Sequence, residues 1–111
     1  MQKDLSHFKK DIEEACKEIL EFIEGYDFEK FSLDNKTYSA VLMKLAIIGE
    51  AASHFPEDIR LKNPHIDWRT IVAMRNFLVH EYFEVDPKIV WKTVNEDVPV
   101  LVESMDTLNL Q

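Results

Sequence analysis

The sequence predicts an all-α protein, an antiparallel bundle of four to five helices whose last helix is kinked or broken near Pro99. Apolar residues recur every three or four positions along most of the chain, which is the period of an amphipathic helix. No segment alternates apolar and polar residues over the length of a strand. The connections between periodic segments are short, so successive helices are expected to run antiparallel. At 111 residues, the chain has the length of a single domain covering residues 1–111.

The first helix is expected to run from about Asp4 to Tyr26, with Gly25 and Asp27 marking its frayed end. Its apolar positions are three or four residues apart throughout, so they form one continuous stripe on the helix. They are Leu5, Phe8, Ile12, Ala15, Ile19, Phe22 and Tyr26.

The second helix is expected to begin at an N-cap residue, Ser32 or Asp34, and to end at Pro56. Its stripe consists of Tyr38, Val41, Leu45, Ile48, Ala52 and Phe55. Gly49 lies inside this helix, where glycine costs about 1 kcal/mol relative to alanine. Its presence indicates that another helix crosses closely at this point.

A connector at residues 56–64 is expected to contain one helical turn at residues 57–61. The third helix then begins at Asp67, a favourable N-cap residue. Ile66 precedes the cap and can pack against Ile71, the arrangement called a hydrophobic staple.

The fourth helix repeats these start signals, with Asp86 as the N-cap and Pro87 at the first helical position. Its stripe is Val90, Val94, Val98, Leu101, Met105 and Leu108. Pro99 lies within this stretch and removes one backbone hydrogen bond, so a kink or break is expected just before it.

Composition excludes several classes of protein. A single cysteine, Cys16, cannot form an internal disulfide and favours a reducing compartment, so a cytoplasmic location is expected. The first residues contain no apolar segment typical of a signal peptide. No apolar run approaches the roughly 20 residues that a membrane span requires.

Charge is unevenly distributed along the chain. The net charge of −8 argues against a protein that coats nucleic acid electrostatically. Residues 60–92 nevertheless carry six basic and four acidic side chains, so this third is +2 and the remainder is −10. The basic third could bind anions at a small site. The charge of solvated helix faces also varies by chance, which would equally explain the imbalance. Its basic residues are Arg60, Lys62, Arg69, Arg75, Lys88 and Lys92.

The third helix, expected over residues 68–83, carries polar residues among apolar neighbours: Arg75, Asn76, His80 and Tyr82. Such groups require partners, which an anionic ligand or a dimer interface would supply. On a straight helix Arg75 and His80 would lie roughly 140° apart. They can converge only if the helix loosens near His80 or if a second copy of the chain supplies one of them.

These residue types suit phosphodiester chemistry. A neutral imidazole such as that of His80 can take or give a proton near neutral pH. The guanidinium of Arg75 can bind a phosphate through two hydrogen bonds as negative charge builds on it. Asn76 is a subsidiary candidate that could orient either group. Arg75 could equally form a salt bridge to an acid such as Glu50.

The pattern Arg75-Asn76-x-x-x-His80-x-Tyr82 resembles the R-x4-6-H motif of HEPN domains. The flanking sequence is similar to the HepT-like branch of that family over about residues 5 to 108. The similar blocks are Ile48-Gly49-Glu50-Ala51, Trp68, Met74-Arg75-Asn76, Leu78-Val79-His80, Val85-Asp86 and Val90-Trp91.

The resemblance implies a HEPN-type bundle that acts as the toxin of a toxin–antitoxin pair. It implies a metal-independent endoribonuclease, working as a homodimer on tRNA or other RNA, with Arg75 and His80 as catalytic residues and Asn76 in support. It further implies a partner, a minimal nucleotidyltransferase antitoxin of the MntA type, which silences the toxin by transferring AMP to Tyr82.

An alternative of a different class is a non-catalytic helical subunit that binds or regulates a nucleotidyltransferase. In that case Arg75 and His80 would hold a dimer together or bind a nucleotide phosphate. No cofactor, DNA partner or membrane association is expected. A metal site is not expected either, because the pairs Glu50/His54 and His80/Glu84 lack the Glu-x-x-His spacing of di-iron bundles.

Overall fold

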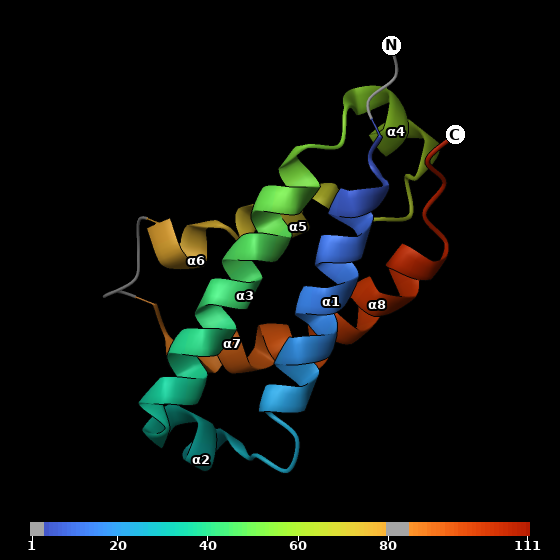
Figure 1. Ribbon diagram of the computed structural model, residues 1–111. Coiled ribbons are helices and arrows are strands. Elements are labelled where there is room, and N and C mark those ends of the chain that lie inside the picture. Colours follow the sequence, from blue (N-terminus) through green and yellow to red (C-terminus); the bar gives the residue numbers. More distant parts are fainter. Residues whose placement is uncertain (1–3, 80–84) are drawn as a thin grey trace.

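Every regular element of the protein is helical in a computed structural model that describes residues 4–79 and 85–111 (Figure 1). The expectation of an all-α bundle is therefore confirmed for the described part of the chain. Within it, no helix is both long enough and apolar enough to span a membrane.

The bundle is built on two long helices, α1 (Ser6–Phe22) and α3 (Asn35–Ser53), which lie side by side (Figure 1). Their facing stripes form the centre of the core, with Ile12, Cys16 and Ile19 of α1 and Leu45 and Ile48 of α3 all 0 % exposed. Helix α1 is shorter than predicted and ends at Phe22.

A short helix that the sequence analysis did not predict, α2 (Phe28–Leu33), joins α1 to α3. Gly25 precedes it with a φ of 77°, in the left-handed region that glycine adopts without strain. The Asp27 carboxylate caps α2 by accepting a hydrogen bond from the Lys30 N–H at 2.8 Å. Of the two predicted caps for α3, Asp34 is the one used, accepting from the Thr37 N–H at 3.1 Å.

The predicted helical turn in the connector is α4 (Glu57–Lys62). Its Arg60 side chain returns to the end of α3, where Nε donates to the Phe55 carbonyl at 2.9 Å. Asn63, which is 1 % exposed, donates to the Ile59 and Asn109 carbonyls and accepts from the Asn109 N–H, each at 2.8 Å. The C-terminal residues are thereby tied to the α4 end of the bundle.

The third predicted helix differs from expectation because it is not continuous. Asp67 caps its start as predicted, accepting from the Thr70 N–H at 3.1 Å. Helix α5 (Trp68–Ala73) then stops, a turn follows at Met74 and Arg75, and α6 (Asn76–Val79) begins directly after it.

The fourth predicted helix consists of three pieces, and the predicted break before Pro99 is confirmed. Helix α7 (Pro87–Lys92) begins at the predicted cap, since the Asp86 carboxylate accepts from the Lys88 N–H at 2.9 Å. A π-helical turn (Thr93–Asp97) follows, and Pro99 lies in the first turn of α8 (Val98–Asp106). In Figure 1, α7 crosses behind the α1–α3 pair and α8 returns beside α1.

Candidate functional site

The turn between α5 and α6 determines where Arg75 leaves the bundle. Two backbone hydrogen bonds close it, from the Met74 N–H to the Ile71 carbonyl at 3.0 Å and from the Arg75 N–H to the Val72 carbonyl at 3.3 Å. Both bonds span three residues instead of the four of an α-helix, so the backbone tightens here. Met74 is 2 % exposed and anchors the turn in the core, whereas the next two residues, Arg75 and Asn76, are exposed.

Gly49 of α3 lies directly against this turn. A Cβ atom at position 49 would be 2.3 Å from the backbone nitrogen of Arg75 and 2.9 Å from the carbonyl oxygen of Val72. Real Cβ atoms essentially never show such distances. The close crossing that the sequence predicted at Gly49 is therefore confirmed, and the segment that crosses there is the turn that carries Arg75.

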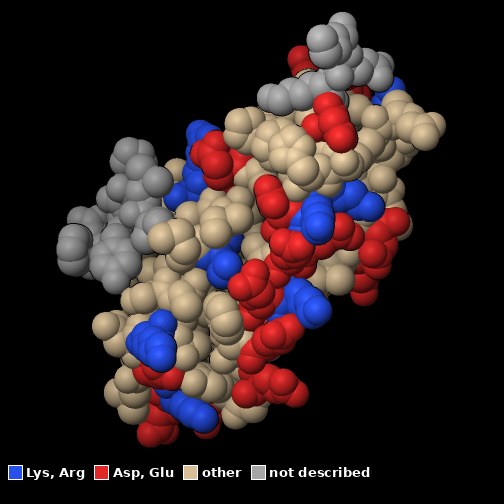
Figure 2. All heavy atoms as spheres, viewed as in Figure 1, with Lys and Arg blue, Asp and Glu red and all other residues tan. Residues whose placement is uncertain are grey.

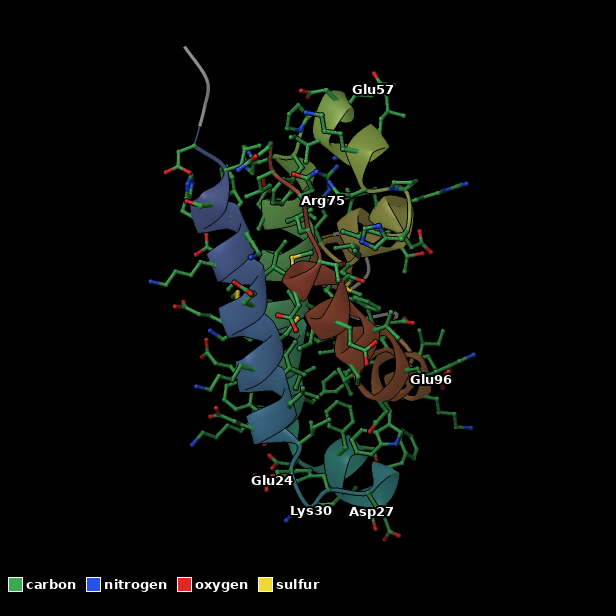
Figure 3. The ribbon with its side chains drawn as sticks, turned by 90° about the vertical axis from the view of Figure 1, so that its right-hand side faces the viewer. Glu24, Asp27, Lys30, Glu57, Arg75 and Glu96 are labelled. Atoms are coloured by element: carbon green, nitrogen blue, oxygen red, sulfur yellow. The ribbon has the colours of Figure 1, made fainter. Side chains whose placement is uncertain are left out.

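The Arg75 guanidinium faces solvent and has no hydrogen bond or ion pair with another of the described residues. Glu50, its predicted alternative partner, instead lies against His54 on the same helix, with its Oε2 3.2 Å from the His54 Nε2. Figure 3 shows Arg75 in the half of the molecule that contains Glu57 of α4, away from the end that contains Glu24, Asp27 and Lys30.

The predicted site residues divide into two groups. Arg75 and Asn76 are neighbours, at the end of the turn and at the start of α6. His80 and Tyr82 lie outside the described residues, so their predicted roles are carried by the resemblance of the motif alone. Glu84, the other half of the pair His80/Glu84 that lacks di-iron spacing, also lies outside the described residues. Among the residues that are described, no group of three or more His, Cys, Asp or Glu side chains could hold a metal ion.

Two of the six basic side chains in residues 60–92 serve the fold. Arg60 binds backbone carbonyls at the end of α3 and lies over the Trp68 ring, with Cζ 5.7 Å from the ring centroid. The Lys62 ammonium donates to the Gln111 carbonyl.

Figure 2 shows acidic side chains concentrated along α1, on the opposite side of α3 from the α5–α6 turn.

A groove of about 320 Å³ lies between the α5–α6 segment and the π-helical turn. Arg69, Thr70 and Phe77 line one side, and Thr93 and Asp97 line the other. Burial raises the pKa of the Asp97 carboxyl, and the neighbouring Glu96 charge adds to this rise. No motif in the sequence pointed to this groove; its signal was the predicted break before Pro99, where the π-helical turn places Thr93 and Asp97 along one side of the groove.

Comparison with known proteins supports the same class of protein as the motif. The model of the family described as "Ribonuclease HepT-like" matches residues 12–108. The chain is 42% identical over 108 residues to a probable ribonuclease HepT of Thermococcus cleftensis, with 97% of this chain and 98% of that protein covered. It is 35% identical over 105 residues to a putative RNase of Methanocaldococcus jannaschii, with 95% and 96% covered. No solved structure gives a significant match.

The helical bundle, the motif and these relatives together define a HEPN domain of the ribonuclease type. The chain is a member of the HepT-like ribonuclease family. The family match covers α3, the α5–α6 turn and the two exposed motif residues Arg75 and Asn76.

Proposed function

We propose that this protein is a metal-independent endoribonuclease and the toxin of a toxin–antitoxin pair. It acts in the cytoplasm as a homodimer on tRNA or other RNA. Membership of the HepT-like ribonuclease family supports the activity. The observation that carries the proposal to particular residues is the exposed guanidinium of Arg75, held on a turn whose backbone is packed against α3.

The proposed reaction is an internal transesterification of the RNA backbone. The neutral imidazole of His80 accepts the proton of a ribose 2′-hydroxyl, and the 2′-oxygen attacks the adjacent phosphorus. The bond between phosphorus and the 5′-oxygen breaks, and the 5′-oxygen leaves with a proton returned by the protonated His80 imidazole or supplied by water. The products are a 2′,3′-cyclic phosphate and a 5′-hydroxyl end, and no metal ion takes part.

Arg75 supplies the charge that this reaction needs. Its planar guanidinium can donate two parallel hydrogen bonds to the phosphate, and these strengthen as negative charge develops on the oxygens. An arginine already paired with a carboxylate would be a poor phosphate ligand, and Glu50 is paired with His54 instead. Asn76, exposed beside Arg75, is placed to orient the same phosphate.

Control of the toxin is assigned to Tyr82. An MntA-type nucleotidyltransferase would transfer AMP to its hydroxyl. This adds bulk and a negative charge two residues from His80, where the RNA phosphate must bind. Like-charge repulsion then opposes substrate binding.

The test is cleavage of a cellular tRNA pool in EDTA by protein expressed without any nucleotidyltransferase. The wild type should release cyclic-phosphate ends, and His80→Ala should lose about 10²- to 10⁴-fold in rate, the usual effect of removing a general acid or base. Its melting temperature and oligomeric state should stay those of the wild type.

Two outcomes would overturn the proposal. A folded, unmodified wild-type protein that cleaves none of several RNAs would favour the non-catalytic subunit of a nucleotidyltransferase. Cleavage that EDTA abolishes would show that the reaction depends on a metal ion.

A further inference from the structure

We infer that Gly49 is a positioning residue for Arg75: the missing side chain at position 49 allows α3 to hold the α5–α6 turn in the conformation that presents the guanidinium. The inference rests on the proposed ribonuclease function for its effect on activity. Its structural part concerns the backbone alone and can be tested without RNA.

The atoms nearest to Gly49 are the two partners of one hydrogen bond. The Arg75 N–H donates to the Val72 carbonyl at 3.3 Å, and this bond closes the turn. A methyl group at position 49 would lie 2.3 Å from that nitrogen and 2.9 Å from that oxygen. It would also lie 2.9 Å from the Cβ atom of Arg75, where the side chain begins. An alanine would therefore press on the closure of the turn and on the base of the Arg75 side chain together.

The turn cannot give way easily, because the contacting atoms of position 49 are backbone or Cβ atoms rather than the far end of a flexible side chain. Met74, between Val72 and Arg75, is buried in the core at 2 % exposure. A retreat from α3 would drag Met74 with it. The strain is thus absorbed by the dihedral angles of the turn, which changes the direction in which Arg75 leaves the backbone.

A change in direction matters more for Arg75 than for an ordinary surface residue. A displacement of about 1 Å in a catalytic group can lower the rate by about 100-fold, because the reacting geometry is lost while binding persists. The expected consequence of Gly49→Ala is a lower kcat with a nearly unchanged KM for RNA.

The experiment compares kcat and KM for RNA in Gly49→Ala, Arg75→Ala and the double variant. Ile48→Val is the matched control, because it trims the neighbouring core residue of α3 and adds nothing against the turn. Gly49→Ala should lose tenfold or more in kcat, and Ile48→Val less than about threefold. The double variant should be no slower than Arg75→Ala alone, because Gly49 acts through Arg75.

Either of two results would overturn the inference on the activity side. One is a folded Gly49→Ala variant with wild-type kcat. The other is a double variant whose loss is the product of the two single losses, since Gly49 would then act independently of Arg75.

A measurement on the wild-type protein tests the inference even if Gly49→Ala does not fold, or if the wild type cleaves no RNA. The Arg75 amide, enclosed between Gly49 and the Val72 carbonyl, should exchange with deuterium far more slowly than a free amide in NMR. Exchange at the rate of an unstructured amide overturns the inference. If no RNA is cleaved but the amide is protected, the proposed function fails while the placement of the turn by Gly49 stands.

Discussion

The α1–α3 pair and the α5–α6 segment are both helical, but the first buries apolar side chains and the second exposes a charged one. Helices α1 and α3 run for 17 and 19 residues without interruption and bury a continuous apolar stripe. Helices α5 and α6 have six and four residues, and the turn between them exposes Arg75 immediately after the buried Met74. In the α5–α6 segment the helix is interrupted at the residue that carries its charge out of the bundle, whereas the α1–α3 pair keeps its helices continuous.

The largest expected effect is on RNA cleavage, and it comes from a substitution in the α5–α6 segment. Arg75→Ala should lower RNA cleavage by about 10²- to 10³-fold, the usual effect of removing a donor to a developing charge. Its stability should change by less than about 0.5 kcal/mol, as for other surface substitutions. Cleavage kinetics together with thermal melting measure both effects.

Arg69→Ala is the control, since it removes the same charge from an exposed position on α5. It should retain most of the activity. Equal losses in the two variants would mean that total positive charge, and not the position of Arg75, supports cleavage.

Leu45→Ala should produce the converse result in the α1–α3 pair. Leu45 is 0 % exposed within α3, so truncation leaves a cavity and should lower the free energy of unfolding by about 2–5 kcal/mol. Urea denaturation measures this loss, and cleavage per folded molecule should stay near that of the wild type. Leu61→Ala, at a residue that is 72% exposed, should change stability by less than about 0.5 kcal/mol. A Leu45→Ala protein of unchanged stability would contradict the assignment of this pair as the main core.

Amide hydrogen exchange should rank the two regions without any substitution. Amides in the middle of α3 should open only when the whole protein unfolds, whereas those of residues 77–79 in the four-residue α6 should open locally. Exchange should therefore be faster in α6 by about tenfold or more. Equal protection in both would remove the contrast in stability.

The smallest expected effect concerns the end of α3 that lies far from Arg75. The Asp34 carboxylate accepts hydrogen bonds from the Tyr26 hydroxyl at 2.6 Å, the Thr37 hydroxyl at 2.7 Å and the Thr37 N–H at 3.1 Å. These bonds, with that of Tyr26 first, lower the pKa of Asp34 to about 2. Because the pKa is lower in the folded state, Asp34 stabilises the protein above its ordinary pKa of about 3.9. That contribution is lost as the pH falls through about 2.

Melting temperatures between pH 5 and pH 2 test this, with Asp34→Asn as the comparison. Asparagine can still cap the helix but does not titrate. The wild-type curve should fall toward that of the variant as the pH decreases. Curves that stay parallel would show that Asp34 does not contribute to acid sensitivity.

Local signals in the sequence were sufficient for most helix starts. Asp34, Asp67 and Asp86 cap the helices that they were predicted to cap, because an N-cap bonds to a backbone N–H only two or three residues away. The break before Pro99 was equally local, since proline removes its own backbone donor. The short helix α2 was missed because six residues are too few to show a period.

The break at Met74 and Arg75 was not predictable in the same way. Residues 68–79 contain neither glycine nor proline, and the apolar pattern continues through the turn. The interruption coincides with the contact to Gly49, which lies 26 positions before Arg75 in the sequence. The sequence predicted a close crossing at Gly49, but it gave no sign of which segment would cross there. The motif residues stood out in the sequence as polar side chains among apolar neighbours, and the resemblance implied their roles; the structure describes Arg75 and Asn76 among them.

The π-helical turn at residues 93–97 determines which face of the following helix, α8, is directed toward the core. Val90, Val94 and Val98 are all 0 % exposed, although eight residues of a regular α-helix would rotate the last of them about 80° away from the first. The wider turn absorbs that rotation, so α8 emerges with Leu101 and Met105 already aimed inward. The direction of the apolar face of the C-terminal helix therefore depends on the wider π-helical turn before it. A regular α-helical turn in its place would rotate Leu101 and Met105 away from the core.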